Sequence, residues 1–357
     1  MKRPILVILL SFILAWSFIF SGCSSEKAET VEKETTEEIT IKTQLQELLD
    51  EHDKKYEFSA SVLIAKDGEV LIRKGYGMAD YFKGIPNKPD TIFSAGSITK
   101  QFTAAAVMLL QERGLLNVQD TVDKYIPDYP EGDKIKLFNL LTNTSGIRDY
   151  IQDNGSGKYH TPEEIISIFK DKPLEFKPGE RFNYCNSSYF LLGYIIEKAS
   201  GMKYEEYMKK HIFEPLEMHN TGFDFSWDTA ENVAKGYTST QAQAVETIYV
   251  DPSFAYAAGA VQTTVEDMYK WNQALYTEKL LKNESIKEMF TPYLSGYAYG
   301  WIIHKDEASH GGGINGYRSY FERNTQENYA IIILGNSDND TSSIVVRKIK
   351  QLLSNAK

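Results

Sequence analysis

Cysteine is almost absent from this 357-residue chain, which contains only Cys23 and Cys185. Two distant cysteines cannot form the set of disulfides on which small secreted domains depend. The chain is, however, long enough to bury a sizeable hydrophobic core without such cross-links. Its length therefore predicts either about two folding units or one large domain with two lobes.

Positive charge is also scarce. The chain has 39 Lys and Arg side chains against 49 Asp and Glu side chains, which gives a formal net charge of −10. Because sequence-independent binding of nucleic acid needs a net basic face, this balance argues against that function. A composition of 42% hydrophobic and 25% charged residues is typical of a globular protein rather than a disordered one.

Metal-binding patterns are missing from the sequence as well. None of the six histidines belongs to a His-Glu-x-x-His motif or to a cluster with cysteines. No internal repeat is evident either. We therefore expect neither a metal site nor a cofactor.

Long apolar runs are confined to the N-terminus, where two basic residues precede an uncharged stretch from Ile5 to Phe20. This layout is typical of a secretory signal. The stretch leads into FSGC, which resembles a bacterial lipoprotein box, although that box usually has Leu in place of Phe20. Residues 1–22 are thus interpreted as a lipoprotein signal peptide and Cys23 as the lipidated residue that holds the protein on the cell membrane. A retained membrane anchor is the alternative, and either would place the rest of the chain outside the cytoplasm.

An acidic segment follows, and we expect residues 23–40 to form a tether. Residues 24–38 contain six Glu and two Lys, and such like charges repel one another and extend a chain. The remaining residues, 41–357, are predicted to fold as one domain.

That domain combines strands from its two ends with helices from its middle. A helix is predicted over residues 41–56, a β-hairpin around Asp67-Gly68, and further strands after Tyr297. We therefore expect an α/β fold, with an antiparallel sheet flanked by helices and an inserted all-helical lobe. The sheet lobe would comprise residues 41–105 and 286–357, and the helical lobe residues 106–285. A cleft between two lobes is a usual place for a functional site.

Ser97 and Lys100 form a Ser-x-x-Lys pair, which places a hydroxyl and an amine one helical turn apart on the same face. A lysine that burial keeps neutral can take the proton of a serine nucleophile. The pattern occurs five times in the chain, so spacing alone carries little weight. Ser97 differs because it opens a long apolar helix, whose N–H groups and dipole can stabilise an oxyanion. Its alternative role is to cap that helix.

Tyr184-Cys185-Asn186 precedes another predicted helix and is the only Tyr-x-Asn among 23 tyrosines. A tyrosine hydroxyl near a lysine can relay a proton to a leaving group, while a carboxamide can hold both the lysine and a substrate amide. The alternative is a buried tyrosine followed by an asparagine turn.

The motif from His310 to Gly313, His-Gly-Gly-Gly, lies between two strand-like runs. Three glycines would spoil an ordinary strand, so a close approach of backbone to a ligand is one reason for them, and a hairpin or bulge is another. The same letters form an oxyanion motif in some α/β-hydrolases. There they precede a Gly-x-Ser-x-Gly elbow, which this chain lacks.

The three motifs in this order resemble the serine hydrolases of the class C β-lactamase and penicillin-binding-protein family. Linking segments agree too, among them LLTNTSGIRDY at 140–150 and FKPGERFNYCNSSYFLLGYIIEKASG at 176–201. The resemblance covers about residues 45 to 355. It implies a β-lactamase/DD-peptidase-like fold and identifies residues 41–357 as a serine hydrolase domain.

The resemblance also implies a role for each motif. Ser97 would be the acylated nucleophile, with Lys100 and Tyr184 moving its proton and that of the leaving group. Asn186 would position Lys100 and the substrate's acyl-side amide. The backbone N–H groups of Ser97 and Gly313 would form the oxyanion hole.

His310, which with Gly312 and Gly313 is expected to lie beside the substrate, is a departure from true class C β-lactamases. These have the lysine of a Lys-Thr-Gly motif, whose charge lies near the carboxylate of a β-lactam or of a D-Ala-D-Ala terminus. Histidine is mostly neutral at pH 7. His-x-Gly is common among the family's peptidase and esterase members, and Arg318 is a candidate for restoring the charge.

The expected function is therefore an extracytoplasmic serine hydrolase of amide or ester bonds, with a D-alanyl peptidase acting on peptidoglycan stem peptides as the leading interpretation. One alternative is a small-ester hydrolase or weak β-lactamase. Another is a non-catalytic lipoprotein that binds the cell wall or β-lactams.

Overall fold

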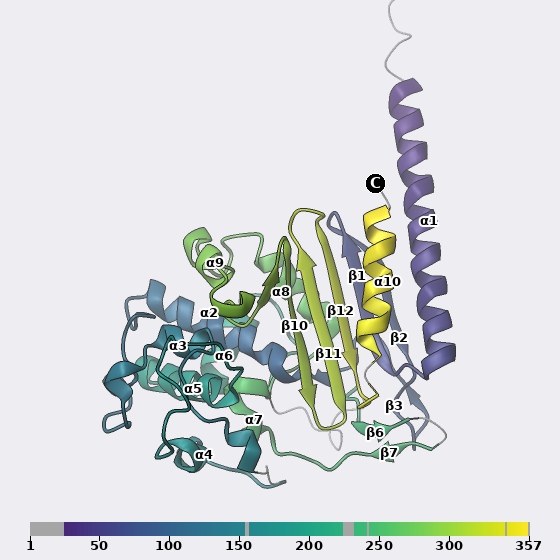
Figure 1. Cartoon of the computed structure of the whole chain (residues 1–357). Helices are drawn as coiled ribbons and strands as arrows, with labels where there is room; N and C mark the ends of the chain where they lie inside the picture. The colour runs from purple at the N-terminus through teal and green to yellow at the C-terminus, as the bar shows by residue number, and fades with distance from the viewer. Residues whose placement is uncertain (1–24, 154–156, 224–231, 241–242, 340, 356–357) are drawn as a thin grey trace, which may run out of the picture.

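A six-stranded antiparallel sheet forms the centre of the computed structural model, which describes residues 25–153, 157–223, 232–240, 243–339 and 341–355. Its strands are β1 Ala60–Lys66, β2 Glu69–Tyr76, β9 Ile302–His304, β10 Glu307–Ile314, β11 Tyr317–Asn324 and β12 Tyr329–Gly335. Across the sheet their order is β2-β1-β12-β11-β10-β9 (Figure 1). The prediction that both ends of the chain build one sheet is confirmed.

The first two strands form the predicted hairpin. Its turn residues, Asp67 and Gly68, both have positive φ, at 52° and 84°. A two-residue turn of this kind matches the twist of the flanking strands, which is why Asp-Gly predicts it.

Six shorter strands pair two by two beside the main sheet, as β3 with β4, β5 with β8, and β6 with β7. They are β3 Met78–Asp80, β4 Ile85–Pro86, β5 Phe93–Ser94, β6 Tyr237–Ser239, β7 Val245–Glu246 and β8 Gln262–Thr263. The β5–β8 pair matters most for the site, because β5 leads directly into Ser97.

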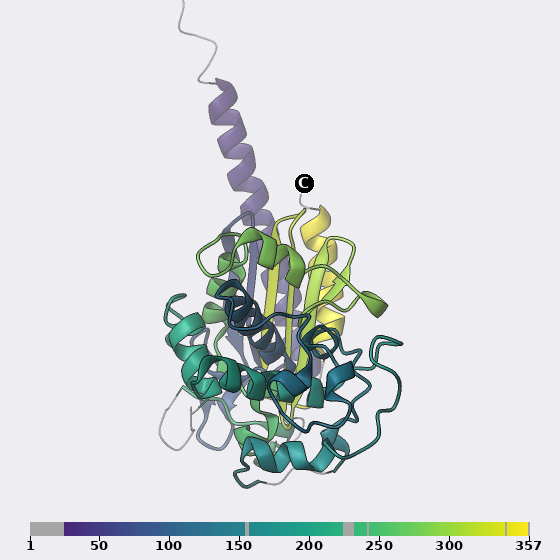
Figure 2. The same cartoon turned by 90° about the vertical axis from the view of Figure 1, so that its left-hand side faces the viewer.

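Strands β1 and β12 are covered on both faces, which explains why they read as continuous apolar runs. On one face, Val62 and Ile331 pack with the helices α1 Ser25–Tyr56 and α10 Ser342–Asn355. On the other face, Leu63 and Ile332 belong to the core shared with the helical lobe. The sheet is thus the middle layer of three (Figures 1 and 2).

Helix α1 is longer than predicted. It begins at Ser25, so the boundary expected at residue 40 between tether and domain lies inside a helix. Glu and Lys favour helix as well as extended chain, which explains the difference. Ile41, Leu45 and Leu49 are buried against the sheet, whereas the N-terminal half projects beyond it (Figure 1).

The predicted signal peptide, residues 1–22, and the predicted lipidation site, Cys23, lie outside the described residues. Within the part of the chain that the structure describes, no helix is long and apolar enough to cross a membrane.

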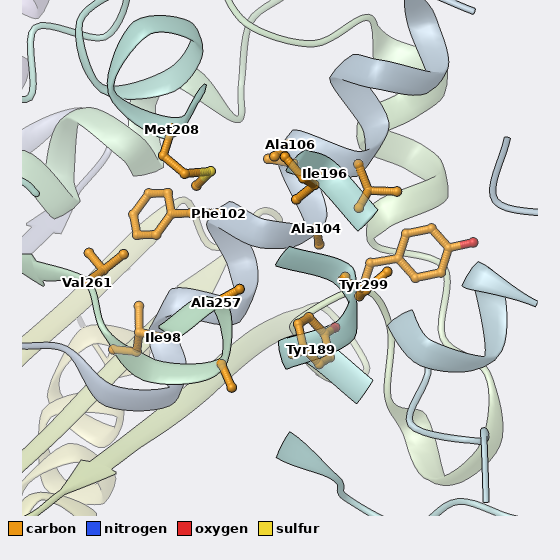
Figure 3. Packing of buried hydrophobic residues seen from close by; sticks show 14 of the residues in the cluster. Ile98, Phe102, Ala104, Ala106, Tyr189, Ile196, Met208, Ala257, Val261 and Tyr299 are labelled. Carbon is orange, nitrogen blue, oxygen red and sulfur yellow. The ribbon is translucent and has the colours of Figure 1, made fainter. Parts of the chain in front are cut away.

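A set of helices lies between β5 and β9 in the chain. They are α2 Thr99–Glu112, α3 Leu137–Leu141, α4 Pro162–Phe169, α5 Asn186–Ser200, α6 Tyr204–Met208, α7 Pro252–Gly259, α8 Val265–Ala274 and α9 Asn283–Met289. Of this set, α5, α6, α7 and α9 pack against α2. Every side chain from Thr99 to Leu110 is buried. Figure 3 shows Phe102 of α2 among Met208 and Val261. The boundaries predicted for the helical lobe, 106–285, fall within α2 and α9, because a hydrophobic pattern does not show where one packed lobe meets the next.

One local prediction is wrong: the glycines of His-Gly-Gly-Gly do not interrupt a strand. They lie inside β10, which pairs residue for residue with β11 from Glu307 to Ile314. At Gly312 a Cβ atom would lie 2.0 Å from the Ala95 carbonyl oxygen and 2.2 Å from the Ser319 hydroxyl. A close backbone approach does explain this glycine, but the approach is to the turn before Ser97.

Candidate active site

Ser97 lies in the short 3-10 helix η1 Gly96–Ile98, directly before α2. It does not cap α2, because the N-cap is Ile98 and no side chain caps that end. Gly96 has a φ of +55°, and a Cβ atom there would lie 2.8 Å from the Gly313 backbone nitrogen. Only glycine suits both conditions. The turn of Ser97 is thereby held against the backbone of β10.

Lys100 is fully buried one turn along α2, beneath Ser97. Its Nζ lies 3.0 Å from Ser97 Oγ, 2.8 Å from Asn186 Oδ1 and 2.8 Å from the carbonyl oxygen of Ala258. Two of these partners are carbonyl oxygens, which can only accept hydrogen bonds. When the amine is neutral, these two oxygens accept both of its N–H groups, and the lone pair is left for the Ser97 hydroxyl.

The electrostatic setting favours that neutral amine. Burial lowers the pKa of Lys100 to about 7, although the nearby Asp149 and Cys185 act in the opposite direction. Tyr184 packs over the amine, with Lys100 Nζ 4.9 Å from its ring centroid. Burial raises the pKa of Tyr184 above its usual value, with a hydrogen bond to Ser97 opposing the rise, so this phenol keeps its proton at pH 7. At that pH Lys100 can take a proton and Tyr184 can give one.

His310 completes the buried side of this group. Its Nδ1 lies 2.6 Å from the Gly311 carbonyl oxygen, and its Nε2 lies 3.2 Å from Tyr297 Oη. The carbonyl can only accept, so the ring proton is on Nδ1 and Nε2 accepts from the tyrosine. Burial and the charge of Lys100 lower the pKa of His310 to about 4, so the ring is neutral at pH 7.

A family model described as Beta-lactamase matches residues 45–355. The chain belongs to the beta-lactamase family. The contacts described above bring the three motifs predicted from the sequence together in one place. The family match and the solved structures show the predicted β-lactamase/DD-peptidase-like fold.

Relatives within the beta-lactamase family include "Putative penicillin-binding protein PbpX" of Bacillus subtilis (strain 168). It is 35% identical over 84% of this chain and 76% of its own length. A solved octameric penicillin-binding protein homologue from Pyrococcus abyssi has a TM-score of 0.78 and 32% identity, covering 88% of this chain and 77% of its own. D-amino acid amidase from Ochrobactrum anthropi SV3 has a TM-score of 0.79 and 25% identity, covering 89% and 99%.

Two contacts of this beta-lactamase family site were not predicted from the sequence. Asp149 accepts a hydrogen bond from Asn186 Nδ2 at 2.9 Å, and the Ala258 carbonyl receives Lys100. Asp149 belongs to LLTNTSGIRDY, a segment that resembles the family but gives no role to this carboxylate. Its distance of 37 residues from Asn186 gives no local signal of contact.

Strand β10 offers the beta-lactamase family site an open edge. Its β9 partner reaches only from Glu307 to Ser309, so from His310 onward that edge has no strand partner among the described residues. Gly311 and Gly313 are exposed there, whereas His310 and Gly312 are buried. An open edge can bind the backbone of an extended peptide.

In the part of the chain that the structure describes, no group of three or more His, Cys, Asp or Glu is placed to hold a metal ion.

The pKa of Lys100 gives a first prediction for this beta-lactamase family member. Because only the neutral amine can accept the Ser97 proton, the acylation rate should rise with pH, reach half its limit near pH 7 and then level off. Rates of covalent labelling of Ser97, measured over a series of buffers at constant ionic strength, check this. A rate that falls as pH rises through 7 would instead mean that the protonated amine is the active form.

Proposed function

We propose that this protein is a serine hydrolase that forms an acyl-enzyme at Ser97. The observation that carries the proposal is the position of Lys100 Nζ, which lies 3.0 Å from Ser97 Oγ and 2.8 Å from each of two carbonyl oxygens. In the neutral amine the two N–H groups bond to these carbonyls, which leaves the lone pair for Ser97. A buried amine held in this way acts as a base for a serine hydroxyl.

The reaction would proceed in two steps. Ser97 Oγ attacks the substrate carbonyl carbon, and Lys100 Nζ takes the hydroxyl proton. Tyr184 donates its proton to the leaving group as the bond breaks and is reprotonated from Lys100. Water then attacks the acyl-enzyme along the same path, while the N–H groups of Ser97 and Gly313 stabilise the oxyanion in both steps.

The proposed substrate is a D-alanyl peptide of the cell wall. Support comes from relatives named as penicillin-binding proteins and from the D-amino acid amidase, whose name describes a D-configured amide substrate. The open edge of β10 suits an extended peptide. Small esters and β-lactams are the second class of substrate that this nucleophile could attack.

The groups expected to bind a substrate carboxylate are already neutral or paired. His310 is neutral, and Arg318 Nη1 lies 2.8 Å from Asp338 Oδ1 and donates to the carbonyl of Tyr317. A charge that is already paired adds little attraction for a second anion. We therefore propose that cleavage does not depend on a free C-terminal carboxylate.

A matched panel of substrates tests this function. N-acylated D-Ala-D-Ala and its C-terminal carboxamide should be cleaved at similar rates, because His310 is neutral and Arg318 is already paired with Asp338. The L-Ala-L-Ala analogue should not be cleaved, and p-nitrophenyl esters and a chromogenic cephalosporin should react more slowly. Product release by chromatography gives the rates, with Ser97→Ala as the blank.

Other outcomes of the panel identify the alternatives. Turnover of the esters or the cephalosporin without peptide cleavage would identify a small-ester hydrolase or weak β-lactamase. Stoichiometric acylation without turnover would identify a non-catalytic binding protein. A strong preference for the free carboxylate over the carboxamide would show that the pairing of Arg318 is broken by substrate.

We also propose an extracytoplasmic location, with a lipid on Cys23 as the membrane anchor. The proposal rests on the basic, apolar and small-residue order of the N-terminal sequence. Mass spectrometry of the N-terminal peptide from membranes would show a diacylglyceryl cysteine, and an intact Met1 with the apolar run would indicate a retained anchor instead.

A further inference from the structure

Asp149 lies behind the catalytic group, on the far side of Asn186 from Lys100. Its Oδ2 accepts hydrogen bonds from Asn186 Nδ2 at 2.9 Å and from the Asn186 backbone N–H at 3.3 Å. Asn186 Oδ1 in turn receives Lys100 Nζ at 2.8 Å. The three side chains therefore form one chain of hydrogen bonds that ends at the Ser97 hydroxyl.

The same carboxylate serves the start of helix α5. The N-cap of α5 is Cys185, which makes no side-chain cap; its thiol donates to the Ile147 carbonyl. Asp149 supplies the missing acceptor from a separate loop. A capping role alone would explain its contact with the backbone N–H. It would leave the second contact, with the carboxamide, unexplained.

That second contact decides which way the Asn186 carboxamide points. The two ends of a carboxamide have nearly the same size, so packing alone does not distinguish them. A carboxylate can only accept, so the NH2 end must face Asp149 and the oxygen must face Lys100. With the carboxamide reversed, an NH2 group would face Lys100, whose lone pair would then be drawn toward Asn186 and away from Ser97.

Asp149 is also the charged neighbour of Lys100. The other titratable groups that face the amine keep their neutral forms at pH 7. Burial raises the pKa of both Tyr184 and Tyr189 above the usual value, raises that of Cys185 to about 12, and together with the charge of Lys100 lowers that of His310 to about 4. Among the described groups around Lys100, the Asp149 carboxylate stabilises the ammonium form most, ahead of Cys185.

We propose that Asp149 is a positioning residue that fixes the orientation of the Asn186 carboxamide and so directs the Lys100 lone pair at Ser97. The proposal rests on the proposed function, in which Lys100 is the base. Asp149 touches neither the nucleophile nor the substrate in this scheme, and it acts through Asn186.

Two substitutions separate its charge from its geometry. Asp149→Asn keeps one oxygen that can accept from Asn186, but it removes the charge and puts an NH2 group in place of the other oxygen. In the profile of acylation rate against pH, the rise that follows deprotonation of Lys100 is called the acid limb. In Asp149→Asn this limb should move about one pH unit lower, because a buried ammonium without a nearby negative charge is less stable. Asp149→Ala removes the acceptor too, so its limiting acylation rate should also fall by about tenfold or more.

The measurement is the rate at which a fluorophosphonate labels Ser97, with loss of fluoride, between about pH 5 and about pH 9. Melting temperatures are recorded alongside. Thr264→Ala is the matched control, because it removes the side-chain cap of α8, which accepts from the Asp267 N–H. It should lower the melting temperature and leave the limb and the limiting rate unchanged.

The outcomes are distinct. If both Asp149 variants lower the melting temperature but keep the wild-type acid limb and limiting rate, Asp149 is only a helix cap and the proposal is wrong.

If wild type shows no Ser97-dependent labelling, the proposed function fails. The effect of Asp149 on Lys100 is then read from the NMR shift of the Lys100 Cε carbon, assigned with Lys100→Gln. An unchanged Lys100 pKa in Asp149→Asn would overturn the electrostatic part.

Discussion

Replacing Ser97 by alanine is expected to lower turnover by about four orders of magnitude or more and to remove fluorophosphonate labelling, because Ser97 is the group that forms the acyl-enzyme bond in the proposed mechanism. The substitution removes the Ser97 hydroxyl oxygen, and the Lys100 amine loses that hydrogen-bond partner. Since Ser97 is not the N-cap of α2, the free energy of unfolding should change little. Intact-mass spectrometry after labelling checks the loss of labelling, and thermal denaturation checks that the stability is unchanged.

The chain provides a matched control for this experiment. Ser167 and Lys170 repeat the Ser-x-x-Lys pattern near the end of α4, where the Ser167 hydroxyl donates to the Glu164 carbonyl. Ser167→Ala should therefore keep wild-type turnover and labelling. Labelling that persists at the wild-type rate in Ser97→Ala would refute the assignment of the nucleophile.

Gly312→Ala is expected to destabilise the fold by about 3 kcal/mol, because inserting a methyl group into a tightly packed place forces the backbone to move. The added carbon would overlap the Ala95 carbonyl oxygen and the Ser319 hydroxyl, which are themselves hydrogen-bonded at 2.7 Å. That bond ties the sheet to the turn before Ser97. Activity should therefore fall together with the free energy of unfolding, measured by urea denaturation.

Gly311→Ala is the control one residue earlier. A Cβ atom at Gly311 would have as its nearest neighbour the Ser319 carbonyl oxygen, at an ordinary 3.8 Å, and the residue is exposed. Its stability should stay close to that of the wild type. Equal stabilities of the two variants would show that the close approach at Gly312 relaxes at little cost.

The parts of the site that the sequence predicted are those held by short spacing. Ser97 and Lys100 are one helical turn apart, so a local pattern brings them together. The β1–β2 hairpin was predicted for the same reason, since its turn residues determine the connection. The resemblance to a known family then placed Tyr184 and His310 beside them, which no spacing could do.

The parts that were missed depend on contacts between distant segments. Asp149 meets Asn186 across 37 residues, and Tyr297 meets His310 through side chains that point into the core from different elements. The pairing of Arg318 with Asp338 was hidden in the same way. The glycines of β10 looked like a break in a strand because the sequence did not show which backbone packs on them.

The pairing of β1 with β12 also sets an order of events during synthesis. Ser97, the proposed nucleophile, and helix α2 belong to the first third of the chain, whereas the strands that complete the sheet are among the last to be made. Contacts of such long sequence separation form slowly, and β1 has one unpaired edge until β12 arrives. A growing chain can therefore hold Ser97 and Lys100 on a formed helix long before β10 reaches them. Reactivity should appear only when the C-terminal strands are in place, so a chain that stops short of β10 carries the nucleophile without the site.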